Sequence, residues 1–129
     1  TDLTDAGMLA ASNLYEDSMM DDAAWPWVAR HYLPAGNLED PAASPIYGSW
    51  RGLPPLSFHA STSEALLNDT LRAVEKAKAE GVTVELALWK DMPHNFAFID
   101  GLSEAAACHQ QVSAFISKAL STHREASHA

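Results

Sequence analysis

The sequence predicts an α/β fold built on a mostly parallel sheet, and three observations support this class. Two short apolar runs, residues 56–60 and 82–89, have the composition and length of strands. A segment of helical periodicity joins them, and a second such segment follows the later run. A strand–helix–strand order makes the strands parallel, with a right-handed crossover. Since a parallel sheet needs more strands and a cover on each face, we expect one part of a larger, doubly wound sheet with helices on both faces.

Residues 1–24 are expected to form a loop with a short helix, and a second short helix is expected to follow. Residues 27–33 can make two helical turns, because Pro26 stands at an early position where its missing N–H costs little. Pro34 then ends the helix. The chain starts without Met and without the features of a targeting signal. We therefore expect an internal or C-terminal piece of a longer protein.

Residues 34–55 are rich in proline and glycine, so this segment is expected to be irregular. A loop of this length in a compact domain usually packs over a functional site or takes part in one. It separates the N-terminal region, 1–33, from the strand–helix unit at 56–122.

The unit at 56–122 is expected to fold as strand, helix, strand and helix, followed by a polar tail at 123–129. Its first helix is predicted from Glu64 to Glu80, and Gly81 stands where a helix C-cap is expected. In the second strand, alternation places four apolar side chains on one face: Val82, Val84, Leu86 and Leu88. The last helix, from about Ser103, carries an apolar stripe made of Leu102, Ala105, Cys108, Val112, Phe115, Ile116 and Ala119.

The composition is that of a globular protein, with 47% hydrophobic and 19% charged residues. A net charge of −9 with eight scattered Lys and Arg residues argues against nucleic-acid binding. No apolar run approaches the roughly 20 residues that a membrane span needs. The single cysteine, Cys108, fits a small buried apolar residue better than a reactive thiol, and it agrees with a reducing, cytoplasmic location.

Two titratable residues follow the two predicted strands, at the edge where open α/β sheets bind ligands. Glu64 follows the first strand and His94 follows the second. Adjacent parallel strands place these loops side by side, so Glu64 could accept a hydrogen bond from His94 as the acid and base of a nucleophilic triad. Each residue alone would also suit a structural role, since an acid favours a helix N-terminus. Asp69 is the rival acid, although its place inside the helix favours bracing the loop or facing solvent.

The other histidines are expected to have no catalytic role. His31 lies in a predicted helix and His59 in a predicted strand, which favours packing or surface positions. His109, His123 and His128 fall in the last helix and the tail. No pair of histidines has the spacing of metal ligands together with a supporting acid, so no metal site is predicted.

Several short motifs follow one another in a specific order: Thr1–Thr4 (TDLT), Ser44-Pro45, Gly52-Leu53-Pro54-Pro55, Glu64 with Leu66 and Asp69, Gly81-Val82, and Met92-Pro93-His94-Asn95-Phe96. Their order and spacing resemble the C-terminal part of the α/β-hydrolase fold, in the hormone-sensitive-lipase-like group of carboxylesterases. The resemblance covers nearly the whole chain. It implies hydrolysis of short-chain acyl esters without a cofactor, with Glu64 as triad acid and His94 as triad base. It also implies a substrate pocket to which Met20, Met92 and Phe96 contribute.

The sequence departs from the family pattern at several points. Glu64 stands where the family most often has Asp, Ser61 stands where it usually has Gly, and Lys90-Asp91 replaces a turn that often contains Gly. The nucleophile elbow, G-x-S-x-G, and the H-G-G-G oxyanion loop do not occur in these residues. In the family's chain order both would precede Thr1. We therefore expect a missing N-terminal portion to supply the serine, and the chain alone to be inactive.

Two alternatives remain open at this point. The chain could be a non-catalytic, hydrolase-like module used for assembly, with strand 82–89 pairing as an edge with a second copy in a homodimer. It could also belong to a serine peptidase of the same fold, since the acid–histidine half would look alike.

Overall fold

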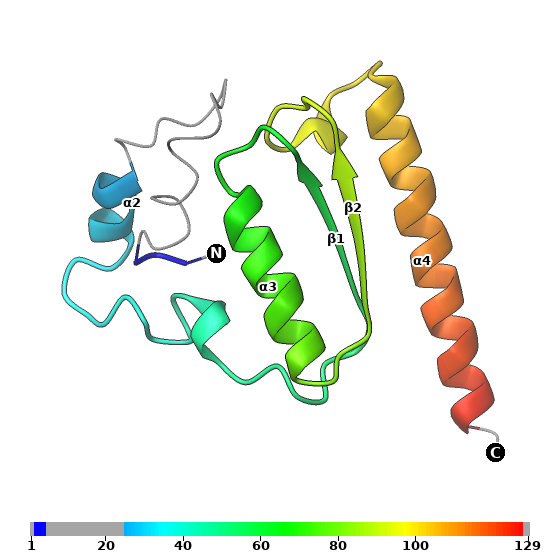
Figure 1. Cartoon of the computed structure of the whole chain (residues 1–129), viewed down its shortest axis with the longest axis horizontal. Coiled ribbons are helices and arrows are strands. Elements are labelled where there is room, and N and C mark those ends of the chain that lie inside the picture. Colours follow the sequence, from blue (N-terminus) through cyan, green and yellow to red (C-terminus); the bar gives the residue numbers. More distant parts are fainter. Residues whose placement is uncertain (1, 5–24, 128–129) are drawn as a thin grey trace. The chain divides into compact units, whose positions relative to one another are not determined.

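A computed structural model describes residues 2–4 and 25–127 of the chain, and it confirms the α/β class (Figure 1). The chain divides into two units, 1–94 and 95–129. The elements in chain order are α2 (Trp25–Tyr32), the 3₁₀ turn η2 (Pro45–Tyr47), β1 (Leu56–Ser61), α3 (Leu67–Ala79), β2 (Val84–Trp89), the 3₁₀ turn η3 (Phe96–Phe98) and α4 (Ser103–Ser127). No helix in the described part is long and apolar enough to cross a membrane.

The first unit is a strand–helix–strand arrangement, as the sequence predicts. β1 and β2 pair in parallel, with Leu56 opposite Val84 and Ser61 opposite Trp89. Helix α3 connects the two strands and contacts both of them (Figure 1). This register brings the carboxyl ends of the strands level with each other, so the loops that follow them start side by side.

Helix α3 is shorter than predicted at its N-terminus and ends as predicted at its C-terminus. The helix begins at Leu67, and residues 64–66 form a turn in which the Leu67 N–H donates to the carbonyl of Glu64 at 3.1 Å. At the other end Gly81 has φ of +81°, a conformation that glycine adopts without strain. The N–H groups of Gly81 and Val82 donate to the carbonyls of Lys78 and Ala77, which is a Schellman cap. Because this cap uses Val82, β2 starts at Val84 instead of residue 82.

In the second unit, the last helix extends further than predicted, into the residues expected to form a polar tail. Helix α4 continues through Ser127, although its last turns are polar. The hydroxyls of Ser121 and Thr122 donate to the carbonyls four residues earlier, and the residues that follow include good helix formers such as Arg124 and Ala126. Polarity was therefore a poor guide to the end of the helix. Closer to its start, α4 buries Cys108, and burial raises the pKa of that thiol.

A buried polar cluster fixes the opening residues to α3. The backbone N–H of Asp2 donates to Asp69 Oδ2 at 2.8 Å, and the Arg72 guanidinium donates to Asp2 Oδ2 at 2.6 Å. Tyr47 of η2 donates its hydroxyl to the same Asp2 oxygen at 3.1 Å, and Ser44 Oγ accepts the N–H of Leu3 at 2.8 Å. Asp69 is 5% exposed, and burial raises the pKa of its carboxyl. Asp69 thus braces the opening segment and does not face solvent.

Replacing Asp69 by alanine is expected to lower the free energy of unfolding by about 1–3 kcal/mol, because it leaves the buried N–H of Asp2 without an acceptor. Urea denaturation followed by circular dichroism measures this change. Glu75→Ala is the matched control, since the Glu75–Lys78 pair is exposed and its loss should change stability by less than about 1 kcal/mol. Equal losses in the two variants would contradict the role of Asp69.

The end of α3 holds part of the loop before β1 through Glu80. Its carboxylate accepts from Lys76 Nζ at 2.6 Å, from the Trp50 N–H at 2.5 Å and from Ser49 Oγ at 3.2 Å. The Lys76 and Trp50 hydrogen bonds lower the pKa of Glu80 from 4.5 to about 2. A carboxyl whose pKa falls on folding stabilises the fold while it is ionised.

The Glu80 contacts are therefore expected to stabilise the protein above about pH 4.5 and to be lost as pH falls toward about 2. Glu80→Gln should flatten the dependence of the unfolding free energy on pH across this window. Urea titrations at a series of pH values measure the slope, with the exposed Glu75→Gln as the control. An unchanged slope in Glu80→Gln would contradict the expectation.

Candidate active site

The structure brings the two predicted site residues into contact. Nδ1 of His94 lies 3.2 Å from Oε2 of Glu64, although 30 residues separate them in the sequence. The Glu64 side chain is 7% exposed and the His94 side chain is 26% exposed. The carboxylate is thus nearly enclosed, whereas the imidazole is reachable from solvent.

The strands and their loops explain why this contact forms. Glu64 lies in the turn between β1 and α3, and His94 lies in the loop after β2. Within that loop Asp91 and Asn95 have φ of 52° and 60°, a left-handed conformation that Asp and Asn tolerate better than most residues. These two positions bracket Met92, Pro93 and His94, and the Pro93 ring fixes one further torsion. The sequence thus favours a sharply bent loop that ends at the histidine.

The contact selects one tautomer of His94. An ionised carboxylate can only accept hydrogen bonds, so Nδ1 must carry the proton that it donates to Glu64. The neutral ring then has its lone pair on Nε2, which is the form that can take a proton from a nucleophile. A buried carboxylate beside Nδ1 also stabilises the imidazolium that forms on proton transfer. The pair therefore has the geometry of a base and its orienting acid.

The three residues expected to line a substrate pocket differ in how far they are buried and in whether the structure describes them. Met92 is half-buried, and its carbonyl accepts from Ser63 Oγ at 3.4 Å. Phe96 is 3% exposed. Met20 lies outside the described residues. The contribution of these three residues to a substrate pocket stays a prediction.

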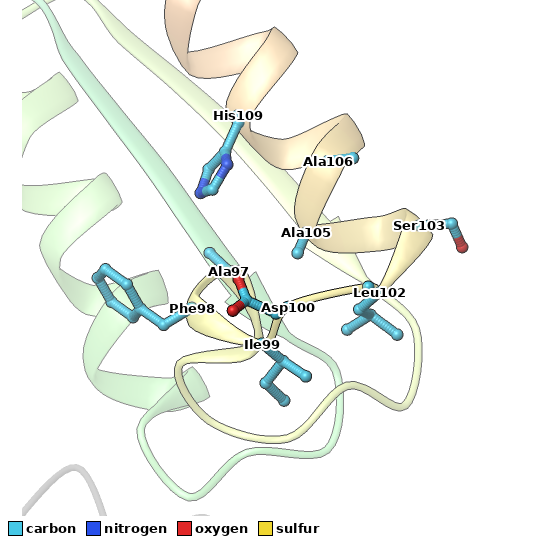
Figure 2. Close-up of a pocket in the computed structure, with 10 residues that line it drawn as sticks. Ala97, Phe98, Ile99, Asp100, Leu102, Ser103, Ala105, Ala106 and His109 are labelled. Carbon is cyan, nitrogen blue, oxygen red and sulfur yellow. The ribbon is translucent and has the colours of Figure 1, made fainter.

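A pocket of about 490 Å³ lies in the second unit, between η3, the loop after it and the start of α4 (Figure 2). Phe98, Asp100 and His109 are among its lining residues, and neither Glu64 nor His94 is one of them. Phe98 is 83% exposed. The lining residues of the pocket therefore all belong to the second unit, whereas Glu64 and His94 belong to the first.

Two other histidines occupy the structural positions expected of them. His31 is exposed on α2, where its ring stacks on Trp27 with centroids 3.9 Å apart. Nδ1 of His59 accepts the indole N–H of Trp89. Nε2 of the same ring lies 3.2 Å from Ser57 Oγ. Burial lowers the pKa of His59, which favours the neutral ring that this arrangement requires. Among the described residues, no group of three or more His, Cys, Asp or Glu side chains could hold a metal ion.

Sequence reasoning missed the hydroxyl residues that connect the two loops of the site. Thr62 accepts the N–H of Asp91 at 3.1 Å, and its own N–H donates to the Trp89 carbonyl at 2.8 Å. Ser61, where the family pattern predicts glycine, is fully buried and accepts the N–H of Ser63 at 3.1 Å. The run Ser61-Thr62-Ser63 directly before Glu64 was the available signal, because Ser and Thr in turns often bond to nearby backbone.

Comparisons with known proteins agree on a single family. A model of the α/β-hydrolase fold matches residues 1–98 of the chain. An acetyl-hydrolase of Streptomyces hygroscopicus is 33% identical over 94 residues, which cover 72% of this chain and 31% of that protein. An esterase of Acinetobacter venetianus is 32% identical over 97 residues, which cover 74% of this chain and 32% of that protein. The chain thus spans about a third of the length of the curated relatives it matches.

Solved structures give the same result for the fold. A homologue of hormone-sensitive lipase from a metagenome library, EstE7, has a TM-score of 0.83 and 31% identity, over 92% of this chain and 41% of that chain. A mutant of the esterase E40 has a TM-score of 0.79 and 31% identity, over 91% of this chain and 39% of that chain. Both similarities extend over nearly all of the present residues and less than half of the other chain.

Proposed function

Since the chain belongs to the α/β-hydrolase fold family, in its hormone-sensitive-lipase-like group, we propose that it forms the acid–histidine part of a carboxylic ester hydrolase. The observation that carries the proposal is the contact of 3.2 Å between Glu64 Oε2 and His94 Nδ1. The serine of the triad would lie outside these 129 residues, in a portion of the protein that precedes Thr1. The chain alone would then be inactive.

The proposed reaction assigns one role to each residue of the pair. Nε2 of His94 takes the proton of the serine hydroxyl while the serine oxygen attacks the ester carbonyl carbon. His94 then gives that proton to the leaving alcohol as the C–O bond breaks, which leaves an acyl-serine. In the second half His94 takes a proton from water, the water oxygen attacks the acyl carbon, and the proton returns to the serine as the carboxylic acid departs. Glu64 holds the tautomer and stabilises the imidazolium in both halves. Backbone N–H groups outside these residues would bind the oxyanion.

The names of the relatives favour short acyl chains as substrates. One curated relative is an acetyl-hydrolase, and a structural relative, EstE5, was soaked with p-nitrophenyl butyrate. EstE5 is 30% identical to this chain, with a TM-score of 0.80, over 92% of this chain and 40% of that chain. We therefore propose acetyl and butyryl esters as the substrate class.

Hydrolysis of p-nitrophenyl acetate, butyrate and palmitate tests this function. The protein is expressed from its gene with any residues that precede Thr1, and residues 1–129 are expressed separately. The longer protein should hydrolyse the acetate and butyrate faster than the palmitate, and residues 1–129 should give no turnover. A peptide p-nitroanilide separates the peptidase alternative, which predicts amide cleavage. A longer protein that cleaves none of the esters would overturn the proposal.

A second candidate, self-association through β2, is supported by one observation. Leu86 and Leu88 of this strand are 37% and 48% exposed, whereas alternation had grouped them with the apolar face. Exposed apolar side chains on one face of a strand favour contact with an apolar surface of a second copy. Sedimentation equilibrium tests this candidate. A molecular mass that rises with protein concentration, and that no longer rises in Leu88→Lys, would support a homodimer. A monomeric mass at every concentration would exclude it.

A further inference from the structure

Three consecutive hydroxyl residues connect the Glu64 turn to the His94 loop. Ser61 ends β1, and Thr62 and Ser63 lead directly into Glu64. The Thr62 N–H donates to the Trp89 carbonyl at 2.8 Å, and Thr62 Oγ1 accepts from the Asp91 N–H at 3.1 Å. Ser63 Oγ donates to the Met92 carbonyl at 3.4 Å. We call residues 61–63 the hydroxyl clamp.

The serine hydroxyls of the clamp form a chain with one consistent direction. With the Ser63 hydroxyl proton directed at the Met92 carbonyl, 3.4 Å away, Ser63 Oγ accepts in its contact of 3.1 Å with Ser61 Oγ. Ser61 Oγ is then the donor in that contact, and it accepts the Ser63 N–H at 3.1 Å. Ser61 is fully buried, where an unpaired hydroxyl would be costly. Every hydroxyl proton of the two serines is therefore assigned, and the chain ends on the histidine loop.

The clamp holds the backbone only a few covalent bonds away from the Glu64 and the His94 side chains. On one side, Ser63 is bonded directly to Glu64. On the other side, Asp91 and Met92 precede Pro93 and His94, and Pro93 removes one free torsion. With Asp91 held in its left-handed conformation, few torsions remain between the clamped atoms and the imidazole. A small displacement of the loop would therefore change the distance between His94 Nδ1 and Glu64 Oε2 by almost the same amount.

We propose that Thr62 and Ser63 are positioning residues, which set the distance between Glu64 and His94 by clamping the Asp91–Met92 backbone. The proposal rests on the proposed function for its kinetic consequences, whereas its geometric content concerns residues 61–94 alone. A positioning error of about 1 Å can cost as much as 100-fold in rate. Neither hydroxyl would touch the substrate, so their loss should lower kcat and leave KM nearly unchanged.

Two variants and two controls test the clamp in the protein expressed from its gene. Thr62→Val removes the acceptor of the Asp91 N–H and keeps the β-branched shape, and Ser63→Ala removes the donor to Met92. Thr62→Ser keeps the hydroxyl. Ser49→Ala removes a hydroxyl whose partner is Glu80, away from the site. We expect Thr62→Val and Ser63→Ala to lower kcat for p-nitrophenyl butyrate about tenfold or more, with KM within about twofold, and both controls to match the unmodified protein.

Proton NMR of the His94 ring supplies a readout that does not need turnover. The Nδ1 proton held by Glu64 should give a downfield, slowly exchanging resonance, assigned by its absence in His94→Ala. Thr62→Val and Ser63→Ala should shift or broaden this resonance, and Thr62→Ser should restore it. An unchanged resonance and kcat in folded Thr62→Val and Ser63→Ala would overturn the clamp. A protein without esterase activity whose resonance still depends on Thr62 and Ser63 would overturn the proposed function and leave the clamp intact.

Discussion

His94→Ala is expected to lower kcat for p-nitrophenyl butyrate by at least about 10⁴-fold, measured in the protein expressed from its gene. Without an imidazole, nothing at this position can take the serine proton or return it to the leaving alcohol, and comparable triads lose activity on this scale. His94 is partly exposed, so the variant should fold and bind substrate with a similar KM. Initial rates at saturating ester measure the loss.

His109→Ala is the matched control for this experiment. His109 is exposed and lines the pocket of the second unit, which does not include His94 (Figure 2). The rate of ester hydrolysis by His109→Ala should therefore stay within about twofold of the rate of the unmodified protein. Near-normal hydrolysis by His94→Ala, or a large loss in His109→Ala, would place the chemistry elsewhere.

Glu64→Gln is expected to lower kcat by about 10³- to 10⁴-fold, because the amide removes the charge that stabilises the imidazolium and can favour the wrong tautomer. Glu64→Asp keeps the charge on a side chain that is one methylene shorter. It should lose less than Glu64→Gln, since the carboxylate still faces Nδ1 from a greater distance. Steady-state kinetics on both variants, with circular dichroism to verify folding, measure the two effects.

Asp69→Asn separates the two acids that the sequence offered. The Asp69 carboxylate accepts the backbone N–H of Asp2, and its Oδ1 lies 3.6 Å from the Arg72 guanidinium. Loss of the Asp69 charge should therefore lower the stability of the protein and leave kcat of the folded protein unchanged. A kcat that falls as far in Asp69→Asn as in Glu64→Gln would reverse the assignment of the triad acid.

Local sequence patterns were sufficient to predict the elements that carry the site. Two apolar runs around a helical segment define a parallel pair, and the parallel pair places Glu64 and His94 at one edge. The Gly81 cap was equally visible, because a glycine that ends a helical pattern favours positive φ. These features depend on residues close together in the chain, which is why periodicity and turn chemistry could identify them.

Contacts between distant residues could not be predicted in the same way. The Asp2–Arg72 ion pair joins residues 70 positions apart, and nothing in either neighbourhood specifies the other. The hydroxyl clamp depends on which residue of β1 lies opposite which residue of β2. Hydrophobic alternation does not specify this register fully, because a shift of two residues leaves the same side chains on each face. The length of α4 was misjudged because polar residues with good helix propensity look like a tail when only apolar periodicity is followed.

Labelling with a fluorophosphonate tests the central claim most directly. The reagent phosphonylates an activated serine, and mass spectrometry of the digested protein locates the label. In the protein expressed from its gene, we predict one labelled serine outside residues 1–129, with labelling strongly suppressed in His94→Ala and Glu64→Gln. A label on a serine within residues 1–129, or full labelling in His94→Ala, would contradict the account of Glu64 and His94 as the acid and base of a triad completed from outside this chain.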